Sequence, residues 1–130
     1  MVSATEIPAL SWANFLGEDR LLVICNDALL PSEIDWDGFA ERDLIILESS
    51  GRYVNYLYKD KSEVPARVLL RSSKRFQEIV ACSDASEFIL IGKDTGVKKR
   101  WEDTLPIHDL FQTIDAMPMR QYEMRTRGRN

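Results

Sequence analysis

The chain has 130 residues, of which 45% are hydrophobic and 29% charged, enough to bury the core of one globular domain. A net charge of −4 argues against wholesale nucleic-acid binding. No apolar run approaches the roughly 18 residues of a membrane span, and two cysteines are too few for a disulfide framework. No Cys–His spacing suggests zinc, so we predict neither a metal nor a cofactor.

The first half of the chain contains two apolar segments of strand type. Residues 19–27, DRLLVICND, and residues 41–50, ERDLIILESS, each hold an apolar run between polar ends, which is typical of strands buried on both faces. Between them, apolar residues recur at near-helical spacing, with Asp27 or Ser32 as the expected cap and Pro31 in the first turn. The order strand, helix, strand predicts a βαβ unit with parallel strands.

The middle of the chain gives weaker signals. Residues 53–58 alternate in a way that fits an additional strand, whereas Pro65 argues against regular structure around it. Residues 72–82, SSKRFQEIVAC, are expected to form a helix with a serine cap and one apolar face.

The last third carries the clearest local pattern. Residues 88–101, FILIGKDTGVKKRW, place two strand-like segments on either side of a turn with two glycines, which predicts a β-hairpin. A final helix follows, with Asp103 or Thr104 as its cap and Pro106 near its start. Its apolar stripe is expected to continue to Met117.

These elements predict one α/β domain over residues 1–130, with a core at about 19–125 and loose ends. The order is a βαβ half, a connecting helix, an antiparallel hairpin and a closing helix. That order is the thioredoxin-like one, with a central mixed sheet.

Two motifs support a narrower match. FILIGKDTGVKKRW, followed by LFQTIDAMPMRQYEMR, resembles the signature of a bacterial family, domain of unknown function 4174. The matching residues are Gly92, Lys93, Asp94, Gly96, Val97, Lys98, Ile114, Asp115, Met117, Pro118, Met119, Arg120 and Gln121. Thr95 departs from the pattern, because the family often has glycine there. The resemblance implies a thioredoxin-like, peroxiredoxin-related fold and supplies no known activity. It favours a periplasmic or secreted protein, although the start, MVSATEIPALSW, lacks the pattern of a secretion signal, and a cytoplasmic protein is the alternative.

The sequence lacks the catalytic groups of thioredoxin-like enzymes. A thioredoxin needs Cys-x-x-Cys just beyond the first strand, where a helix N-terminus lowers the thiol pKa, but the chain reads CNDALLPSE. Residues 27–33 contain neither the cysteine nor the threonine of a peroxiredoxin. Ser86 and Glu87 stand where the fold usually has a cis-proline. We therefore expect no classical oxidoreductase activity.

Cys25 and Cys82 leave three interpretations open. Cys25 ends the first predicted strand and Cys82 precedes the third. In this fold those strands are antiparallel neighbours, so the two cysteines can approach within the roughly 7 Å between Cα atoms that a disulfide needs. They are two unrelated thiols, a structural disulfide or a redox-active pair.

The segment IDAMPMRQYEMR is expected to be a packed tail. Met117 continues the apolar stripe, and Pro118 is expected to change the chain direction. Three further residues are expected to hold the tail against the core: Met119, Tyr122 and Met124. Arg120 and Arg125 are expected to bond Asp115, Asp43 or a free carbonyl. Copper ligation by the methionines is the alternative.

The preferred hypothesis is a non-catalytic binding module for an unknown protein or acidic ligand. The candidate acidic-ligand face comprises the hairpin cations Lys93, Lys98, Lys99 and Arg100 together with C-terminal arginines such as Arg125. The alternative is a thiol–disulfide or redox-sensing protein that uses Cys25 and Cys82. A third hypothesis, an enzyme of another class, takes Asp27, Glu33 and Asp35 as acid–base groups, although caps and a solvated helix face explain them better.

Overall fold

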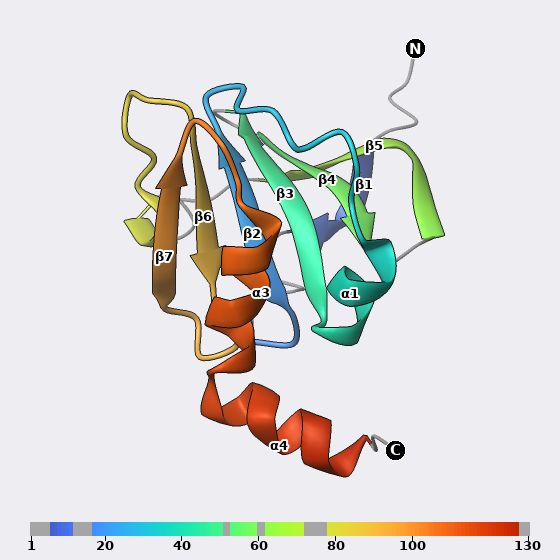
Figure 1. The fold of residues 1–130 in the computed structure, drawn as a ribbon. Coiled ribbons are helices and arrows are strands. Elements are labelled where there is room, and N and C mark those ends of the chain that lie inside the picture. Colours follow the sequence, from blue (N-terminus) through green and yellow to red (C-terminus); the bar gives the residue numbers. More distant parts are fainter. Residues whose placement is uncertain (1–5, 12–16, 51–52, 60–61, 72–77, 128–130) are drawn as a thin grey trace.

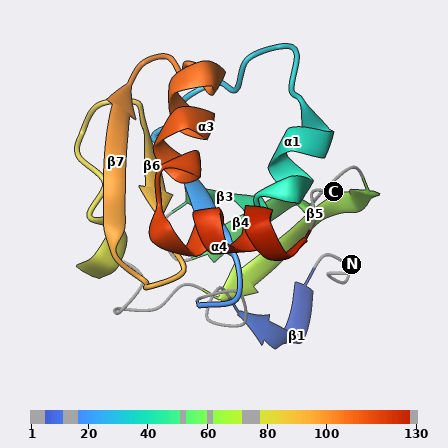
Figure 2. The ribbon, with the colours of Figure 1, turned by 60° about the horizontal axis from the view of Figure 1, so that its bottom comes forward.

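The computed structural model describes residues 6–11, 17–50, 53–59, 62–71 and 78–127. Its strands are β1 (Glu6–Ser11), β2 (Arg20–Cys25), β3 (Leu44–Ser50), β4 (Tyr53–Lys59), β5 (Ser62–Arg71), β6 (Glu87–Ile91) and β7 (Val97–Glu102). Its helices are α1 (Trp36–Glu41), α3 (Ile107–Asp115) and α4 (Pro118–Thr126). Helices α1 and α3 lie on the same face of the sheet, and α4 crosses one end of it (Figures 1 and 2).

The described strands form one sheet of seven, in the order β1-β5-β4-β3-β2-β6-β7. β2 pairs in parallel with β3, and the chain between them contains α1. On its other side β2 pairs antiparallel with β6, which forms a hairpin with β7. This mixed arrangement, closed by α3, is the α/β thioredoxin-like fold, so the predicted fold class and the predicted hairpin are confirmed.

The central strands are apolar on both faces. β2 and β6 are buried along their whole length, which explains why their sequences, RLLVIC and EFILI, show no polar alternation. Side chains of one face of β2, β3 and β6 pack with α1 and α3 in a single core cluster. Its main members are Leu22, Ile24, Phe39, Leu44, Ile46, Phe88, Leu90, Leu110 and Ile114.

Helix α1 is shorter and begins later than the sequence predicts. Asp35 caps it, because Oδ1 of Asp35 accepts a hydrogen bond from the Gly38 N–H at 3.0 Å. The predicted caps Asp27 and Ser32 are therefore wrong. Asp27 instead follows β2 in a turn, with a φ of 60°.

The closing helix α3 also begins without its predicted cap. Pro106 precedes its first turn, and no side chain caps it, so Asp103 and Thr104 do not have the predicted role. Asp103 has a φ of 66° in the turn after β7. Of the helix predicted over residues 72–82, the structure describes only the end: residues 78–80 are helical, and 72–77 lie outside the described residues.

Two outer strands differ from the prediction. Residues 1–10 are predicted to be a loose end, but Glu6–Ser11 pair in parallel with β5. Pro65 lies inside β5, where irregular structure is predicted. The register between β4 and β5 shifts between Tyr56 and Tyr58, and Pro65 lies opposite this shift. An irregular stretch of ladder of this kind is where a strand tolerates the missing N–H of proline.

Gly38 provides a test of how α1 packs. A glycine-to-alanine change inside a helix ordinarily stabilises by about 1 kcal/mol. A Cβ at Gly38, however, would lie 2.6 Å from Cε2 of Phe111 and 2.7 Å from Oδ2 of Asp35. We predict that Gly38→Ala lowers the free energy of unfolding by about 1–3 kcal/mol, as overpacking does, measured by urea denaturation. Adding Phe111→Leu to this variant should recover part of the loss, and a Gly38→Ala protein of higher stability would contradict this packing.

Candidate functional site

The turn between β6 and β7 presents the first part of the motif. The Gly92 N–H donates to the Gly96 carbonyl, and the Thr95 N–H donates back to the Gly92 carbonyl, each at 2.9 Å. Oδ1 of Asp94 accepts from the Gly96 N–H at 3.0 Å, and its other oxygen pairs with Lys98. Thr95 has a φ of 70°, a conformation that favours glycine. This conformation explains why glycine suits the position where the chain departs from the family pattern.

The junction between α3 and α4 presents the second part. Met117 stands between the helices with extended backbone, and its N–H donates to the Ile114 carbonyl at 2.9 Å. Pro118 occupies the first turn of α4, where its fixed φ and missing N–H are favourable. Pro118 therefore changes the chain direction, as predicted, but by starting a second helix. The Gln121 side chain fastens the junction by donating to the Asp115 carbonyl at 3.0 Å.

Glu123 of α4 lies at the centre of a buried ion-pair cluster. Its carboxylate pairs with Arg20 at 3.1 Å and with Lys93 at 2.7 Å, and these three side chains are at most 11% exposed. Lys93 also pairs with Asp43 at 2.7 Å, and Asp43 pairs with Arg127 at 2.7 Å. The cluster joins α4 to the start of β2, the turn before β3 and the turn between β6 and β7.

Arg120 forms a second attachment on the same helix. Its side chain is 1% exposed and pairs with Asp115 at 3.0 Å and with Glu41 at 2.8 Å. It also donates to the Glu41 carbonyl at 3.1 Å. Asp115 pairs in turn with Arg42, whose guanidinium lies 3.9 Å from the centre of the Phe111 ring. The predicted contact between Arg120 and Asp115 is present.

The predicted apolar anchoring of the tail is wrong for two residues. Met119 is 50% exposed and Tyr122 is 61% exposed, whereas Met124 is partly buried. Charged side chains take their place, because the buried residues of α4 are Arg120 and Glu123. Arg125 lies over the Tyr122 ring, with 6.0 Å between its Cζ and the ring centre. Arg127, which the sequence analysis does not single out, makes the contact with Asp43 instead.

The ion pairs lower the pKa values of three carboxylates. Burial by itself raises the pKa of Glu123, but hydrogen bonds from Arg20 and Lys93 hold this pKa below its ordinary value of 4.5. Burial also opposes ionisation of Asp43 and Asp115. Bonds from a lysine and an arginine to Asp43, and from two arginines to Asp115, hold both pKa values below 3.8. All three groups therefore stay charged at neutral pH.

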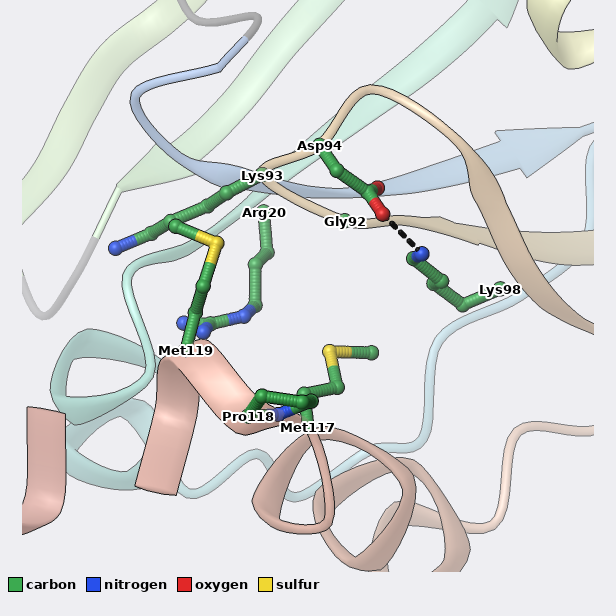
Figure 3. A pocket seen from close by; sticks show the side chains of 8 residues that line it. All are labelled: Arg20, Gly92, Lys93, Asp94, Lys98, Met117, Pro118 and Met119. Carbon is green, nitrogen blue, oxygen red and sulfur yellow. Dashed lines mark hydrogen bonds and ion pairs between the residues drawn. The ribbon is translucent and has the colours of Figure 1, made fainter. Parts of the chain in front are cut away.

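A pocket of about 200 Å³ lies where the turn meets the helix junction. We call it the junction pocket, and its lining residues are Arg20, Gly92, Lys93, Asp94, Lys98, Met117, Pro118 and Met119. Figure 3 shows Asp94 and Lys98 on one side of the opening, with Arg20 and the two methionines across from them. A second hollow of about 520 Å³ adjoins it along α4 and shares Lys93, Pro118 and Met119. Tyr122 and Arg127 also line this second hollow.

The other predicted cations lie elsewhere and already have partners. Lys99 pairs with Asp109 at 2.7 Å. Arg100 pairs with Glu87 at 3.3 Å and donates to backbone carbonyls before β6. A continuous basic face for an acidic ligand, which also includes Arg125, stays a prediction.

Cys25 and Cys82 form a disulfide, with their Cα atoms 5.9 Å apart. Cys25 is fully buried at the end of β2, and Cys82 is an exposed residue. Hydrogen bonds hold the loop of Cys82 independently of the sulfur atoms. The Asn26 side chain donates to carbonyls of this loop, and Oε2 of Glu87 accepts from the Ser83 N–H at 2.7 Å.

The disulfide and the junction pocket lie at opposite ends of the same strand. Arg20 is the first residue of β2 and Cys25 is the last. At about 3.3 Å per residue, the two positions are roughly 17 Å apart. The residues of the motif therefore do not surround the cysteines.

Two central residues of the site, Arg20 and Glu123, are not predicted from the sequence, and Asp43 is expected only as a partner of Arg120 or Arg125. Arg20 looks like the polar end of a strand, and Glu123 looks like one of several charges in a polar tail. Arg20 and Glu123 are 103 residues apart in the sequence, and Lys93 and Asp43 are 50 residues apart. These residues can be brought together only when both the strand pairing of the sheet and the direction of the chain at the α3–α4 junction are known.

The fold and this geometry define a thioredoxin-like domain with a pocket at the helix junction. The chain matches the family "domain of unknown function (DUF4174)" over residues 11–123 and belongs to it. No curated protein matches the chain. Among solved structures it is similar to the reduced 2-Cys peroxiredoxin of Plasmodium vivax, with 16% identity and a TM-score of 0.51. That match covers 85% of this chain and 84% of the other, and at this identity it shows the fold alone.

The paired carboxylates predict how stability depends on pH. A carboxylate whose pKa is lower in the folded state stabilises the fold above its unfolded pKa, and this contribution is lost as the pH falls through the folded pKa. We expect the urea midpoint to be constant near neutral pH and to fall below about pH 4.5, because the unfolded chain then takes up protons on Glu123, Asp43 and Asp115 while the folded chain keeps these groups charged to lower pH. Asp115→Asn should make this fall shallower. A midpoint that does not change between neutral and acidic pH would contradict the cluster.

Proposed function

We propose that this domain is a non-catalytic binding module and that the junction pocket is its ligand site. One observation carries the proposal: the two parts of the family motif, about twenty residues apart in the sequence, line the same pocket. Gly92, Lys93 and Asp94 come from the turn and Lys98 from the start of β7, and Met117, Pro118 and Met119 come from the helix junction.

The ion pairs give this pocket a fixed shape before any ligand arrives. Two carboxylates order the buried side chain of Lys93, and Lys98 pairs with Asp94 at the exposed edge of the pocket. Arg20 is held by Glu123 and by the Arg42 carbonyl. Binding to ordered side chains costs less conformational entropy than binding to free ones, which favours a recognition role.

The position of the disulfide supports a separate, structural role for it. By the chain-entropy estimate, a bond that closes a loop of 57 residues stabilises by about 4 kcal/mol. Because Cys25 is buried and its neighbour across the sheet is Glu87, a Cys25 thiolate would be poorly solvated and close to a negative charge. A poor leaving thiolate makes exchange at Cys82 unfavourable.

Thiol–disulfide exchange is the second candidate function, and one observation favours it. Cys82 is exposed, so an external thiolate can reach that residue. Reduction at this site requires an external dithiol that gives up two electrons and becomes a disulfide.

We also propose an oxidising compartment, the periplasm or the outside of the cell. A disulfide persists there and is rare in the cytosol. Within the described residues, no helix has the length and apolar character to cross a membrane.

The binding proposal is tested by a matched pair of glycine variants. A Cβ at Gly92 would lie 2.7 Å from Cε of Lys98, whose flexible end can move into the pocket, whereas a Cβ at Gly96 makes only ordinary contacts. The probes are small aromatic and aliphatic acids, amides and amines. Their binding is measured from shifts of the protein's backbone amide signals in two-dimensional NMR. We expect the probes that bind to shift the amide signals of Gly92, Lys93 and Met119. Gly92→Ala should lower the affinity of these probes by about tenfold, whereas Gly96→Ala should leave it unchanged. Hits that gather elsewhere would contradict the proposal.

The structural role of the disulfide is tested by its redox potential. We expect Cys25 and Cys82 to remain bonded in glutathione buffers, with a reduction potential below about −300 mV, as measured by alkylation and intact mass. The pair Cys25→Ala and Cys82→Ala should lower stability by about 2–4 kcal/mol and leave probe binding at the junction pocket unchanged. A potential near those of glutaredoxins, about −200 to −230 mV, would instead support thiol exchange.

A further inference from the structure

A buried donor at the junction pocket has no acceptor. The Arg20 side chain is 1% exposed, and its terminal nitrogens donate to Glu123 and to the Arg42 carbonyl. Its Nε is buried and has no hydrogen-bond partner among the described residues. Arg20 lines the pocket together with Met117 and Met119, all labelled in Figure 3. Because leaving a charged donor unpaired is costly, this atom favours an acceptor supplied by a ligand, which reaches the covered Nε when the flexible methionine walls move aside.

The start of α4 adds a second attraction for negative charge. The helix begins at Pro118 with no side-chain cap and no acidic residue in its first turn. Pro118 and Met119 both line the junction pocket, so the positive end of the helix dipole borders it. Free N–H groups at a helix N-terminus bind anions, and Arg20 lines the same pocket as the first residues of α4.

The rest of the wall is suited to an apolar group. Met117, Pro118 and Met119 supply flexible or flat hydrophobic surface. The volume of about 200 Å³ is slightly larger than the roughly 150 Å³ of an engineered cavity that holds benzene. The pocket therefore has room for one ring or one branched aliphatic group.

We propose that the junction pocket binds a carboxylate attached to an apolar group. The carboxylate lies between Arg20 Nε and the N-terminus of α4, and the apolar group lies against Met117 and Met119. This inference rests on the proposed binding function and names its ligand class. A phosphate, with its higher charge, needs more donors than these and gains nothing from methionine walls.

Two sources share this chemistry. One is a small free acid, and the other is the C-terminal residue of a polypeptide, whose side chain and carboxylate supply both parts. A polypeptide would also enter the adjoining hollow of about 520 Å³, along the exposed Tyr122.

The test follows the Arg20 Nε–H signal by NMR in the full chain, assigned by its loss in Arg20→Lys. The free-acid probes are isocaproate and phenylacetate, with their amides as matched neutral compounds and inorganic phosphate as a competitor. The polypeptide probe is an acetylated tripeptide ending in leucine, with a free or an amidated C-terminus. We expect both acids to move the Nε–H signal and to bind at least about tenfold more tightly than their amides.

A variant supplies an internal competitor without disturbing the ion pairs. Met119→Glu places a carboxylate at the half-exposed start of α4, where acidic residues stabilise a helix. We expect it to weaken acid binding by at least about tenfold, whereas Met119→Gln, of the same length and without charge, should have a small effect. Glu102→Gln, on β7 outside the pocket, should have none.

Each outcome decides the proposal. A tripeptide that binds more tightly than the free acids and shifts Tyr122 supports the polypeptide source, and equal affinities support a free acid. Acids and amides that bind the pocket equally, phosphate that displaces the acids, or an unmoved Nε–H signal would overturn the carboxylate assignment and leave the binding function standing. If no probe shifts any amide of the pocket, both proposals fail.

Discussion

The buried carboxylate of Glu123 is the constraint on which the site depends. It holds α4 against the start of β2 through Arg20 and against the turn between β6 and β7 through Lys93. The helix buries little apolar surface of its own, since Met119 and Tyr122 face solvent. Removing one partner of such a pair leaves an uncompensated buried charge, which typically costs about 3–5 kcal/mol. The wall of the junction pocket is therefore positioned by charge, on a scaffold positioned by hydrophobic packing.

Two separate groups of contacts lie at the two ends of β2. At the end of the strand, the disulfide and the hydrogen bonds of Asn26 and Glu87 fix a loop. At its start, Arg20 enters the cluster that shapes the pocket. Between them β2 and its neighbours form the packed core. This thioredoxin-like scaffold has no cysteine in α1, the helix that follows β2. The residues of the family motif instead lie at the opposite end of β2, around the junction pocket.

The sequence predicts the parts of the fold that depend on local pattern. The apolar runs of β2, β3 and β6 and the glycine turn before β7 need no knowledge of distant residues. Helix boundaries are less predictable, because Asp35 competes with other good caps nearby. Pro118 is ambiguous in principle, since proline ends one helix and favours the first turn of another. The chain forms a second helix from Pro118 because Arg120 and Glu123 then pair with residues far away in the sequence.

The most direct test of this account is hydrogen–deuterium exchange of Glu123→Gln compared with the natural chain. Loss of the charge should release α4 and the turn of Gly92–Gly96 together. The account therefore predicts faster exchange of amides in these two segments and unchanged exchange in β2 and β3. Unchanged exchange in α4 would show that Glu123 does not hold the helix. Faster exchange throughout the sheet would show that the cluster supports the whole fold rather than the junction pocket.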